Sequence, residues 1–441
     1  MRLKRLTLRN MRLFNANEQI LSFDEDKNVT ILVGNNGSGK STVLDSIAVE
    51  ISAFIANFKG QSAKQFTDSD VHFDENDILG DYLKVGAIFG TKYNGDLEII
   101  RTRQGGSKAP EGSLKNVNDY AEKLIEMVNS NEDCILPVVA YYGTGRGQIN
   151  PPARKRDFKK AFTRWDGYSG ALEANTNFKR FIEWFDLMED KERRDREEKR
   201  DFDYKSPYLE TIRKALKAFV GERFSNPRML LSPLRFVMDE KIGRGKTREV
   251  RIEQMSDGYK IITAMVADIA SRMAELNPNM SNPLMGSGIV LIDEVDLHLH
   301  PRWQRVIIDN LAKTFPKIQF IVTTHSPLII SGAFDNAQII ILGENETKQE
   351  VLASRYINYD ISQLLLSELF DLPSSRAPKW DSLLMEQSSL LRKSHLSEDE
   401  QARLKQLSSE LSALSIGDSL DSIRSRELMY KIAEQLGIKN D

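Results

Sequence analysis

Short apolar runs followed by stretches with helical spacing recur along the chain. Residues 28–34 form an apolar run that ends at Gly34, and the residues that follow change to helical spacing. Apolar runs of similar length stand at 135–140, 288–292 and 318–324. Runs of this length are typical of buried strands, and strands that alternate with helices favour a largely parallel sheet. The pattern therefore predicts an α/β fold.

Two segments alternate apolar and polar residues and predict β-hairpins. The first hairpin turns at Asn94-Gly95, a pair that is expected to supply the positive φ angles of a tight turn. The second covers residues 235–254 around a basic glycine loop. Residues 1–10 alternate leucine with lysine and arginine, lack the apolar segment of a signal peptide and are expected to form a first strand. Parallel and antiparallel strands are therefore expected together in a mixed sheet.

Changes in composition predict four parts of the chain. A first lobe covers residues 1–150, because apolar patterning stops and the chain becomes basic immediately afterwards. A helical insertion is expected at 151–230, a second lobe at 231–350 and a leucine-rich helical C-terminal region at 351–441.

Two of the helical segments leave alternatives open. Thirteen consecutive charged residues at 189–201 are typical of a solvated helix, or of a contact with a partner or nucleic acid. A capping box at Ser397 and Glu400 predicts a helix start in the C-terminal region. The leucines that follow, Leu407 and Leu411 among them, form a surface for a partner or oligomer, or equally pack within their own domain.

The composition excludes several classes of protein. The 441 residues carry 61 basic and 64 acidic side chains, and the net charge of −3 excludes a histone-like chain. Hydrophobic residues make up 40%, enough for two or three packed units. Apolar runs stay well below the roughly 18 residues of a membrane span, so no membrane partner is expected. The single cysteine, Cys134, lies among apolar residues, which predicts a buried thiol and a cytoplasmic protein.

The residues that follow the strand at 28–34 carry the strongest motif. Residues 34–41 satisfy G-x-x-x-x-G-K-[ST], in the strand-to-helix context that this pattern requires. The glycines let backbone N–H groups converge on phosphate oxygens, Lys40 reaches the β and γ phosphates, and the Ser41 hydroxyl ligates Mg²⁺. The nucleotide-binding residues are expected to be Gly34, Asn35, Asn36, Gly37, Ser38, Gly39, Lys40, Ser41 and Thr42.

A pair of carboxylates follows the apolar strand at 288–292. Asp293 is expected to hold Mg²⁺ through water, and Glu294 to orient or deprotonate a water against the γ-phosphorus. Such a pair often follows a strand by chance. Because the same chain also carries the glycine loop, a catalytic role is favoured. Because Mg²⁺ and Lys40 offset the phosphate charge, the carboxylates can approach the nucleotide. ATP and Mg²⁺ are therefore the predicted cofactors.

Several motifs together resemble the ATP-binding-cassette (ABC) ATPases, in the soluble branch that contains the RecF, SMC and Rad50 proteins. The glycine loop is accompanied by S-x-G at Ser256 to Gly258, by Asp296 after the carboxylate pair, and by His325 at the end of the next strand. The segments YYGTGR, QMSDGYK, LIDEVDLHLHPRWQ and TTHSP are similar to the family that includes the ATPase subunit of Septu-type anti-phage systems. This resemblance covers most of residues 1–345. It implies a two-lobed ABC-ATPase head with a helical insertion.

The resemblance also implies roles for single residues. Ser256 and Gly258 would meet the γ-phosphate held by a neighbouring subunit, and Asp296 would lie at the dimer seam. His325 would sense the γ-phosphate and join Glu294 as a catalytic residue. Asp257 and Tyr259-Lys260 replace the Gly and Gly-Gln of the transporter signature, and an anion at Asp257 favours slow hydrolysis. Arg12, Arg146 and Gln148 are weaker candidates, Arg12 near the nucleotide and the others in a loop that joins the lobes.

Partners follow from the same resemblance. Each chain has one glycine loop and one S-x-G motif at a helix start upstream of the carboxylate pair, and these cannot meet within one chain if the resemblance holds. A homodimer formed on ATP binding is expected as a minimum, with a higher oligomer favoured. A separately encoded HNH-type nuclease in prokaryotic anti-phage defence is the other expected partner, because the chain carries no nuclease motif.

Two other functions remain open at this stage. A DNA-repair or end-binding ATPase similar to RecF or Rad50 would contact DNA through basic stretches such as 153–160 and 241–251. Long coiled coils would favour this function, and the sequence contains none. A nucleotide-gated scaffold would instead hold ATP and scarcely cleave it.

Overall fold

The fold was analysed in a computed structural model that divides the chain into two compact units. These units are Met1–Ser354 and Arg355–Asp441, and each is described by itself. The structure describes residues 1–73, 76, 78–147, 161–174, 178–231, 234–243, 245–333, 337–343, 347–352, 356, 359–370, 372, 380–393 and 397–412. Gln148, the basic stretch at 153–160 and the C-terminal residues beyond 412 lie outside these ranges. No helix within the described ranges has the length and hydrophobicity needed to cross a bilayer.

A six-stranded sheet forms the centre of the first unit, and the four apolar runs of the sequence are four of its strands. In spatial order the strands are β13 (Thr347–Leu352), β12 (Ala337–Leu342), β3 (Val29–Val33), β11 (Ile318–Thr323), β10 (Gly288–Ile292) and β6 (Val138–Tyr142). All neighbours pair in parallel except β13, which is antiparallel at the edge. Because the carboxyl ends of parallel strands share one edge, the segments after β3, β6, β10 and β11 meet there.

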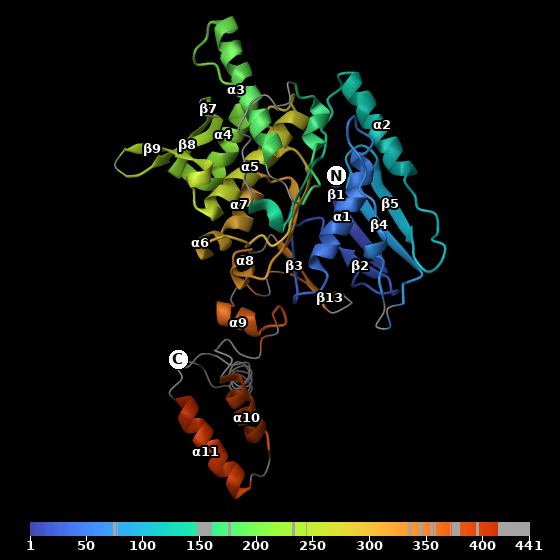
Figure 1. The fold of residues 1–441 in the computed structure, drawn as a ribbon, viewed down its shortest axis with the longest axis vertical. Helices are drawn as coiled ribbons and strands as arrows, with labels where there is room; N and C mark the ends of the chain where they lie inside the picture. The colour runs from blue at the N-terminus through green and yellow to red at the C-terminus, as the bar shows by residue number, and fades with distance from the viewer. Residues whose placement is uncertain are drawn as a thin grey trace, which may run out of the picture. The chain divides into compact units, whose positions relative to one another are not determined.

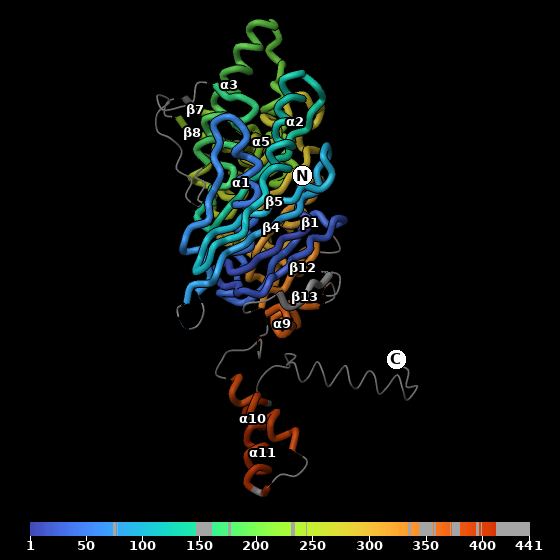
Figure 2. Tube along the Cα trace, turned by 90° about the vertical axis from the view of Figure 1, so that its right-hand side faces the viewer, coloured from blue at the N-terminus to red at the C-terminus, as the bar shows by residue number. Residues whose placement is uncertain are grey.

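An antiparallel sheet completes the part of the first unit built from residues 1–129. Its strands are, in order, β2 (Gln19–Ser22), β1 (Arg2–Arg9), β4 (Tyr82–Thr91) and β5 (Gly95–Gln104), and Figure 2 shows β1, β4 and β5 side by side. Helix α1 (Lys40–Ile55) packs against strands of both sheets, while α2 (Lys115–Asn129) contacts β5. Nearly every residue of α1 is buried, as expected for a helix enclosed by two sheets.

The turn between β4 and β5 differs from the predicted one. The hairpin itself is confirmed, yet only Gly95 has a positive φ, of 63°, and Asn94 does not. Thr91 pairs with Gly95 across a three-residue loop, and the Thr91 hydroxyl both accepts from the Asn94 N–H and donates to the Gly95 carbonyl. These bonds stabilise a wider loop that needs a single left-handed residue.

Helices and a third sheet follow β6 along the chain. Figure 1 shows α3 (Lys179–Lys199) extending away from the sheets, with α4 (Pro207–Val220) and α5 (Asp257–Leu276) beside it. The predicted second hairpin is confirmed as β8 (Leu234–Lys241) and β9 (Thr247–Arg251), and β7 (Phe224–Leu231) adds a third strand. The charged run lies on α3 as far as Lys199. Its Glu192 is buried, where it pairs with Arg196 and Arg213.

Shorter elements complete both units. The first unit also contains α6 (Pro301–Gln304), α7 (Ile307–Thr314), α8 (Pro327–Ser331) and the 3₁₀ turns η1 (Asp68–Asp70), η2 (Thr144–Gly147), η4 (Arg164–Tyr168), η5 (Gly221–Arg223), η6 (Ile252–Gln254) and η7 (Pro283–Met285). The second unit contains α9 (Ile361–Leu366), α10 (Asp381–Leu391) and α11 (Glu398–Ser412). The capping box of Ser397 and Glu400 is confirmed at the start of α11. Leu407 is fully buried, so this part of the leucine surface packs within the second unit.

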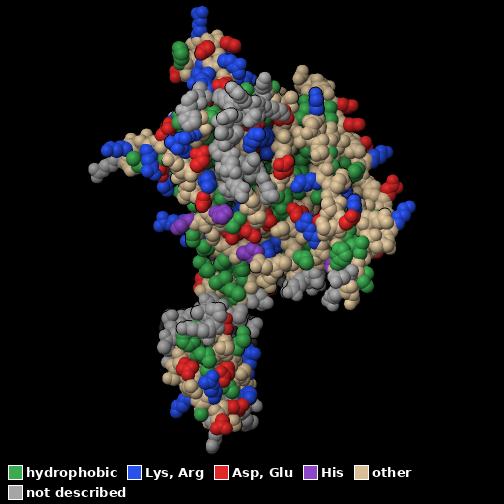
Figure 3. All heavy atoms as spheres, viewed as in Figure 1, with side chains coloured by type: hydrophobic (Ala, Val, Ile, Leu, Met, Phe, Trp, Pro, Cys, Tyr) green, Lys and Arg blue, Asp and Glu red, His purple; other side chains and the backbone are tan. Residues whose placement is uncertain are grey.

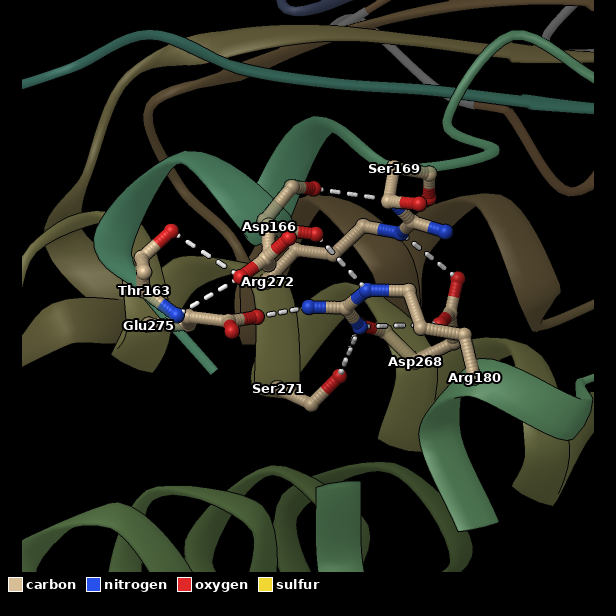
Figure 4. Close-up of polar contacts among 9 residues, drawn as sticks. Thr163, Asp166, Ser169, Arg180, Asp268, Ser271, Arg272 and Glu275 are labelled. Atoms are coloured by element: carbon tan, nitrogen blue, oxygen red, sulfur yellow. Dashed lines mark hydrogen bonds and ion pairs between the residues drawn. The ribbon is translucent and has the colours of Figure 1, made fainter. Parts of the chain in front are cut away.

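A buried network of charges fixes α5 against its surroundings. Figure 4 shows Arg272 and Asp268 of α5 facing Arg180 of α3. Arg272 donates to Asp268 at 2.9 Å and to the carbonyl of Gly167 at 2.8 Å, while Arg180 pairs with Glu275. Buried charges are tolerated when each is paired, and each of these four side chains has a partner of opposite charge. The network therefore fixes the orientation of α5, the helix that begins at the S-x-G motif.

Candidate functional site

The glycine loop lies at the shared edge of the central sheet, between β3 and α1. Gly39 precedes α1 with a left-handed φ of 92°, and a Cβ atom at this position would lie 2.8 Å from the Phe14 ring. No side chain caps the start of α1. The first N–H groups of α1 therefore have no side-chain acceptor. Free N–H groups at the positive end of a helix are the arrangement that binds a phosphate.

Two side chains of the loop fit a nucleotide triphosphate. The Lys40 ammonium donates to the carbonyls of Gly34 and Asn35, each at 2.8 Å, so the loop wraps around it. Burial lowers the pKa of Lys40, while Asp293 and Glu294 raise it. The Ser38 hydroxyl is buried and has no hydrogen-bond partner among the described residues. A bound phosphate would supply the acceptor that this hydroxyl lacks.

Exposure varies along the same loop. Asn35, Asn36, Gly37 and Ser41 are exposed, whereas Thr42 is buried on the inner side of α1.

Ser41 and Asp293 meet beside the loop, although 252 residues separate them in the sequence. The Ser41 hydroxyl donates to one Asp293 oxygen at 2.9 Å. The other Asp293 oxygen accepts from the Thr323 hydroxyl at 2.5 Å. A hydroxyl beside a carboxylate, open to phosphate oxygens, suits Mg²⁺, which keeps several waters and takes few protein ligands. These two residues would hold the metal ion when ATP is bound.

Glu294 occupies a tight turn directly after β10. Its φ of 45° lies in the left-handed region that residues other than glycine rarely adopt. The Glu294 N–H donates to the Thr323 hydroxyl at 2.7 Å, and its carbonyl accepts from Arg146 at 2.5 Å. Strained backbone of this kind is concentrated at functional sites, where the surroundings hold it in place.

His325 and Asp296 lie at the same edge, joined through Thr324. The Thr324 hydroxyl donates to Asp296, and the ring of His325 is exposed beside it. Partial burial and the charge of Lys40 lower the pKa of His325, whereas Asp296, Glu294 and Asp293 raise it. His325 follows β11, which lies between β3 and β10 in the sheet, so the fold brings His325 to the edge where the glycine loop and the carboxylates lie. A lowered pKa keeps its imidazole neutral at pH 7.

The S-x-G motif begins α5 and lines a different cavity. Ser256 is exposed and makes no capping bond, and Asp257 forms an ion pair with Lys260 at 2.7 Å. The adjoining cavity has a volume of about 700 Å³, and its walls include Arg248, Tyr259, Arg302 and Trp303. Neither the glycine loop nor the carboxylate pair lines it. The motif therefore borders a cavity that the glycine loop does not line.

Arg12, a weaker candidate, lies near the glycine loop, and its guanidinium is already paired with carboxylates. Its guanidinium donates to Asp45 at 2.6 Å and to Asp70 at 2.9 Å. The Tyr141 hydroxyl also donates to Asp45, at 3.0 Å.

Thr323, Tyr141 and Asp45 were missed by sequence reasoning, because a hydroxyl or an isolated carboxylate carries no motif of its own. For Thr323 the available signal was its position, one residue before the strand-end Thr324.

Comparisons with known proteins show which proteins this chain is similar to. Residues 5–219 match a family described as "AAA domain", and residues 146–331 match one described as "AAA domain, putative AbiEii toxin, Type IV TA system". The chain is 29% identical to "Retron Vc95 probable ATPase" from Vibrio cholerae serotype O1 biovar El Tor, over 79% of this chain and 76% of that protein. It is also 29% identical to "Retron Ec83 probable ATPase" from Escherichia coli, over 84% and 77%.

A further match covers a smaller part of the chain. The chain is 34% identical to "Septu protein PtuA" from Bacillus mycoides (strain KBAB4), over 37% of this chain and 24% of that protein. The chain thus resembles an ABC-type ATPase of the PtuA-like kind. The expected resemblance to the Septu ATPase subunit is thereby confirmed. The expected α/β fold is confirmed by the sheets and helices of the first unit. Among solved structures, the chain aligns with the SmcHead bound to the C-winged helix domain of ScpA, with a TM-score of 0.49, 16% identity and coverage of 81% and 99%.

Proposed function

We propose that this PtuA-like chain binds and slowly hydrolyses ATP at composite sites between two copies, and that the cycle regulates a separately encoded HNH-type nuclease in prokaryotic anti-phage defence. One observation carries the ATPase part: Ser41, Asp293 and Glu294 meet beside the uncapped start of α1. The similarity to retron ATPases and to a Septu protein supports the defence part. A cytoplasmic location, where ATP is abundant, belongs to the same proposal.

The proposed chemistry assigns one task to each group. Lys40, the Ser38 hydroxyl and the first N–H groups of α1 hold the phosphates, and Ser41 and Asp293 hold Mg²⁺. Bound Mg²⁺ offsets the negative charge of the transferring phosphoryl group. Glu294 accepts a proton from the attacking water, and neutral His325 forms a hydrogen bond with the γ-phosphate.

The geometry of α5 supports composite sites. Asp268, eleven residues after Asp257, is bonded to Tyr142 at the end of β6, close to the carboxylate turn. At a rise of about 1.5 Å per residue, the S-x-G end of α5 lies about 17 Å further along the helix axis. The cavity beside Ser256 is not lined by the glycine loop that would hold the γ-phosphate, and in this proposal a second copy supplies the Ser256 contact.

Slow hydrolysis is proposed from the signature itself. Asp257 places a carboxylate where the transporter form has glycine, and its pairing with Lys260 offsets only part of that charge. Measured phosphate release would place kcat below about 1 per second, the lower end of ordinary enzymes. A Glu294→Gln chain should release no phosphate, and equal rates near zero for both proteins would favour the nucleotide-gated scaffold.

A second experiment tests the composite sites. With Mg·ATP, Glu294→Gln should double its mass in solution, because nucleotide would be trapped between two copies. Adding Ser256→Arg should keep it monomeric while labelled ATP still binds, since Ser256 is exposed and its side chain makes no capping bond. Ser113→Arg, at another exposed serine, is the matched control and should still dimerise. A Glu294→Gln chain that binds ATP and stays monomeric would refute this part.

The nuclease link requires the neighbouring gene product. Co-purification of both proteins and a cleavage assay with and without ATP would test it directly. Cleavage that needs the partner and responds to ATP is expected, and cleavage by this chain alone would contradict the proposal.

One surface favours contact with DNA as a second candidate function. Figure 3 shows Lys and Arg side chains gathered on the part that projects to the left, which Figure 1 identifies as the hairpin of β8 and β9. Lys241, Lys246 and Arg248 are exposed there. Phosphate contacts of this kind weaken as salt rises. DNA binding that falls with salt, and falls again in Lys246→Ala, would support it.

A further inference from the structure

The backbone of the Asp293-Glu294 turn is held from two directions. Its N–H groups donate toward the neighbouring strands: Asp293 to the Tyr142 carbonyl at 2.8 Å, and Glu294 to the Thr323 hydroxyl at 2.7 Å. Its carbonyls face the other way, and a single side chain, Arg146, donates to both. The Arg146 guanidinium lies 2.6 Å from the Asp293 carbonyl oxygen and 2.5 Å from that of Glu294.

Arg146 is committed to this position. It is 1% exposed, and a third bond, to the Gly143 carbonyl at 2.9 Å, fixes the guanidinium to the end of β6. Burial lowers its pKa, while the charges of Asp293, Asp296 and Glu294 raise it. An arginine stays charged in proteins, so Arg146 places a cation among carboxylates that would otherwise repel one another.

The turn needs such support because of its conformation. The left-handed φ of Glu294 is unfavourable for a residue with a side chain and persists only when its surroundings fix it. Lysine cannot replace Arg146 here, since one ammonium lacks the planar set of donors that reaches three carbonyls at once. The direction in which the Glu294 carboxylate leaves the turn therefore depends on the guanidinium.

We propose that Arg146 is a positioning residue for hydrolysis, whose guanidinium fixes the backbone from which the carboxylates of Asp293 and Glu294 project. This inference rests on the proposed ATPase function and deepens it. Arg146 acts through Glu294 and touches no nucleotide in this assignment. Its loss should therefore reduce turnover while ATP binding, which depends on the glycine loop, stays intact.

The test compares Arg146→Lys and Arg146→Ala with a matched control. Arg164 also donates to backbone carbonyls, those of Leu276 and Cys134, but lies away from the turn, so Arg164→Lys reports the loss of an ordinary structural arginine. Both Arg146 variants should lose about 100-fold in kcat, as for other misplaced catalytic groups. The Kd of fluorescent Mg·ATP should change by less than about threefold. Arg164→Lys should keep its kcat.

Two further measurements separate positioning from folding. Millimolar guanidinium chloride should restore part of the activity of Arg146→Ala, because it can occupy the vacated site, and should not raise that of Arg164→Ala. In Arg146→Lys, hydrogen exchange should accelerate in the peptide around Glu294 and stay unchanged along α1.

The outcomes of these measurements are distinct. If the wild-type protein releases no more phosphate than Glu294→Gln, the ATPase proposal is refuted. Hydrogen exchange would still test whether Arg146 holds the turn. Unchanged exchange at the turn, or an active wild type with kcat retained in Arg146→Ala, would overturn the positioning role. A variant that loses ATP affinity together with kcat would also overturn it.

Discussion

Replacing Thr323 by valine should weaken both the fold and the catalytic turn. Thr323 is fully buried at the end of β11, and valine keeps its shape while removing the hydroxyl. That hydroxyl donates to Asp293 at 2.5 Å and accepts from the Glu294 N–H at 2.7 Å. The substitution therefore removes one hydrogen bond to a carboxylate and leaves one backbone donor without its acceptor.

The size of the effect follows from these two bonds. A hydrogen bond to a charged group contributes about 1.5–3 kcal/mol, and an unsatisfied buried donor costs about 1–3 kcal/mol. Asp293 keeps its bond from Ser41, and Glu294 is only partly buried, so water can replace part of the loss. The lower part of the range then applies, a decrease of about 3 kcal/mol in the free energy of unfolding. If the same energy is lost in the transition state, kcat falls about 100-fold.

Two assays on three proteins measure this effect. Urea unfolding and phosphate release would be compared for wild type, Thr323→Val and Thr323→Ser, the last of which keeps the hydroxyl. Thr323→Ser should lose about 1 kcal/mol or less, the cost of one buried methyl group. If Thr323→Val unfolds within about 0.5 kcal/mol of wild type, as an ordinary surface substitution does, the reasoning about the turn is refuted.

Three other predictions concern charged groups elsewhere in the first unit. Burial raises the pKa of Glu50 well above its usual 4.5, while Arg101 lowers it, so stability should decrease as pH rises from 4.5 toward the folded value; Glu50→Gln should remove this decrease and melt higher than wild type at pH 8. Arg272→Met leaves Asp268 buried without its main partner and should cost about 3–5 kcal/mol of unfolding free energy by urea titration, whereas Lys313→Met on the surface should be nearly neutral. Because the pKa of His325 is lowered, kcat should fall to half its maximum only below pH 6.5, and a half-maximal rate at or above 6.5 that disappears in His325→Gln would contradict the lowered pKa.

Sequence periodicity predicted the strands and the edge of the sheet at which the site forms. The apolar runs at 28–34, 288–292 and 318–324 became β3, β10 and β11, and parallel pairing brought Ser41 to Asp293 across 252 residues. This worked because strand-end residues of a parallel sheet share one edge whatever their separation along the chain.

The contacts that support the site could not be predicted in the same way. Thr323 meets the carboxylate turn because the register sets Ile292 opposite Val322, and no local pattern encodes that register. The sequence predicted only that Arg146 lies in a loop that joins the lobes. The structure shows that its guanidinium is buried and donates to the carbonyls of Asp293 and Glu294. At Asn94 the hydroxyl of Thr91 stabilised a wider turn than the dipeptide favours. For Thr323 and Arg146 a tertiary hydrogen bond decided the outcome, and at the turn a side-chain hydrogen bond within the loop did.

Tyr142 connects the carboxylate turn to helix α5. Its carbonyl accepts from Asp293, and its hydroxyl donates to Asp268, near the middle of α5, at 2.8 Å. On the proposed function, a shift of Asp293 after hydrolysis would be transmitted through Tyr142 to α5, the helix that begins at the S-x-G motif. In an assembly of two such chains, that motif would press on the nucleotide of the neighbour. Hydrolysis at one site would then alter the affinity for ATP at the other, and the two sites would hydrolyse ATP in sequence rather than independently.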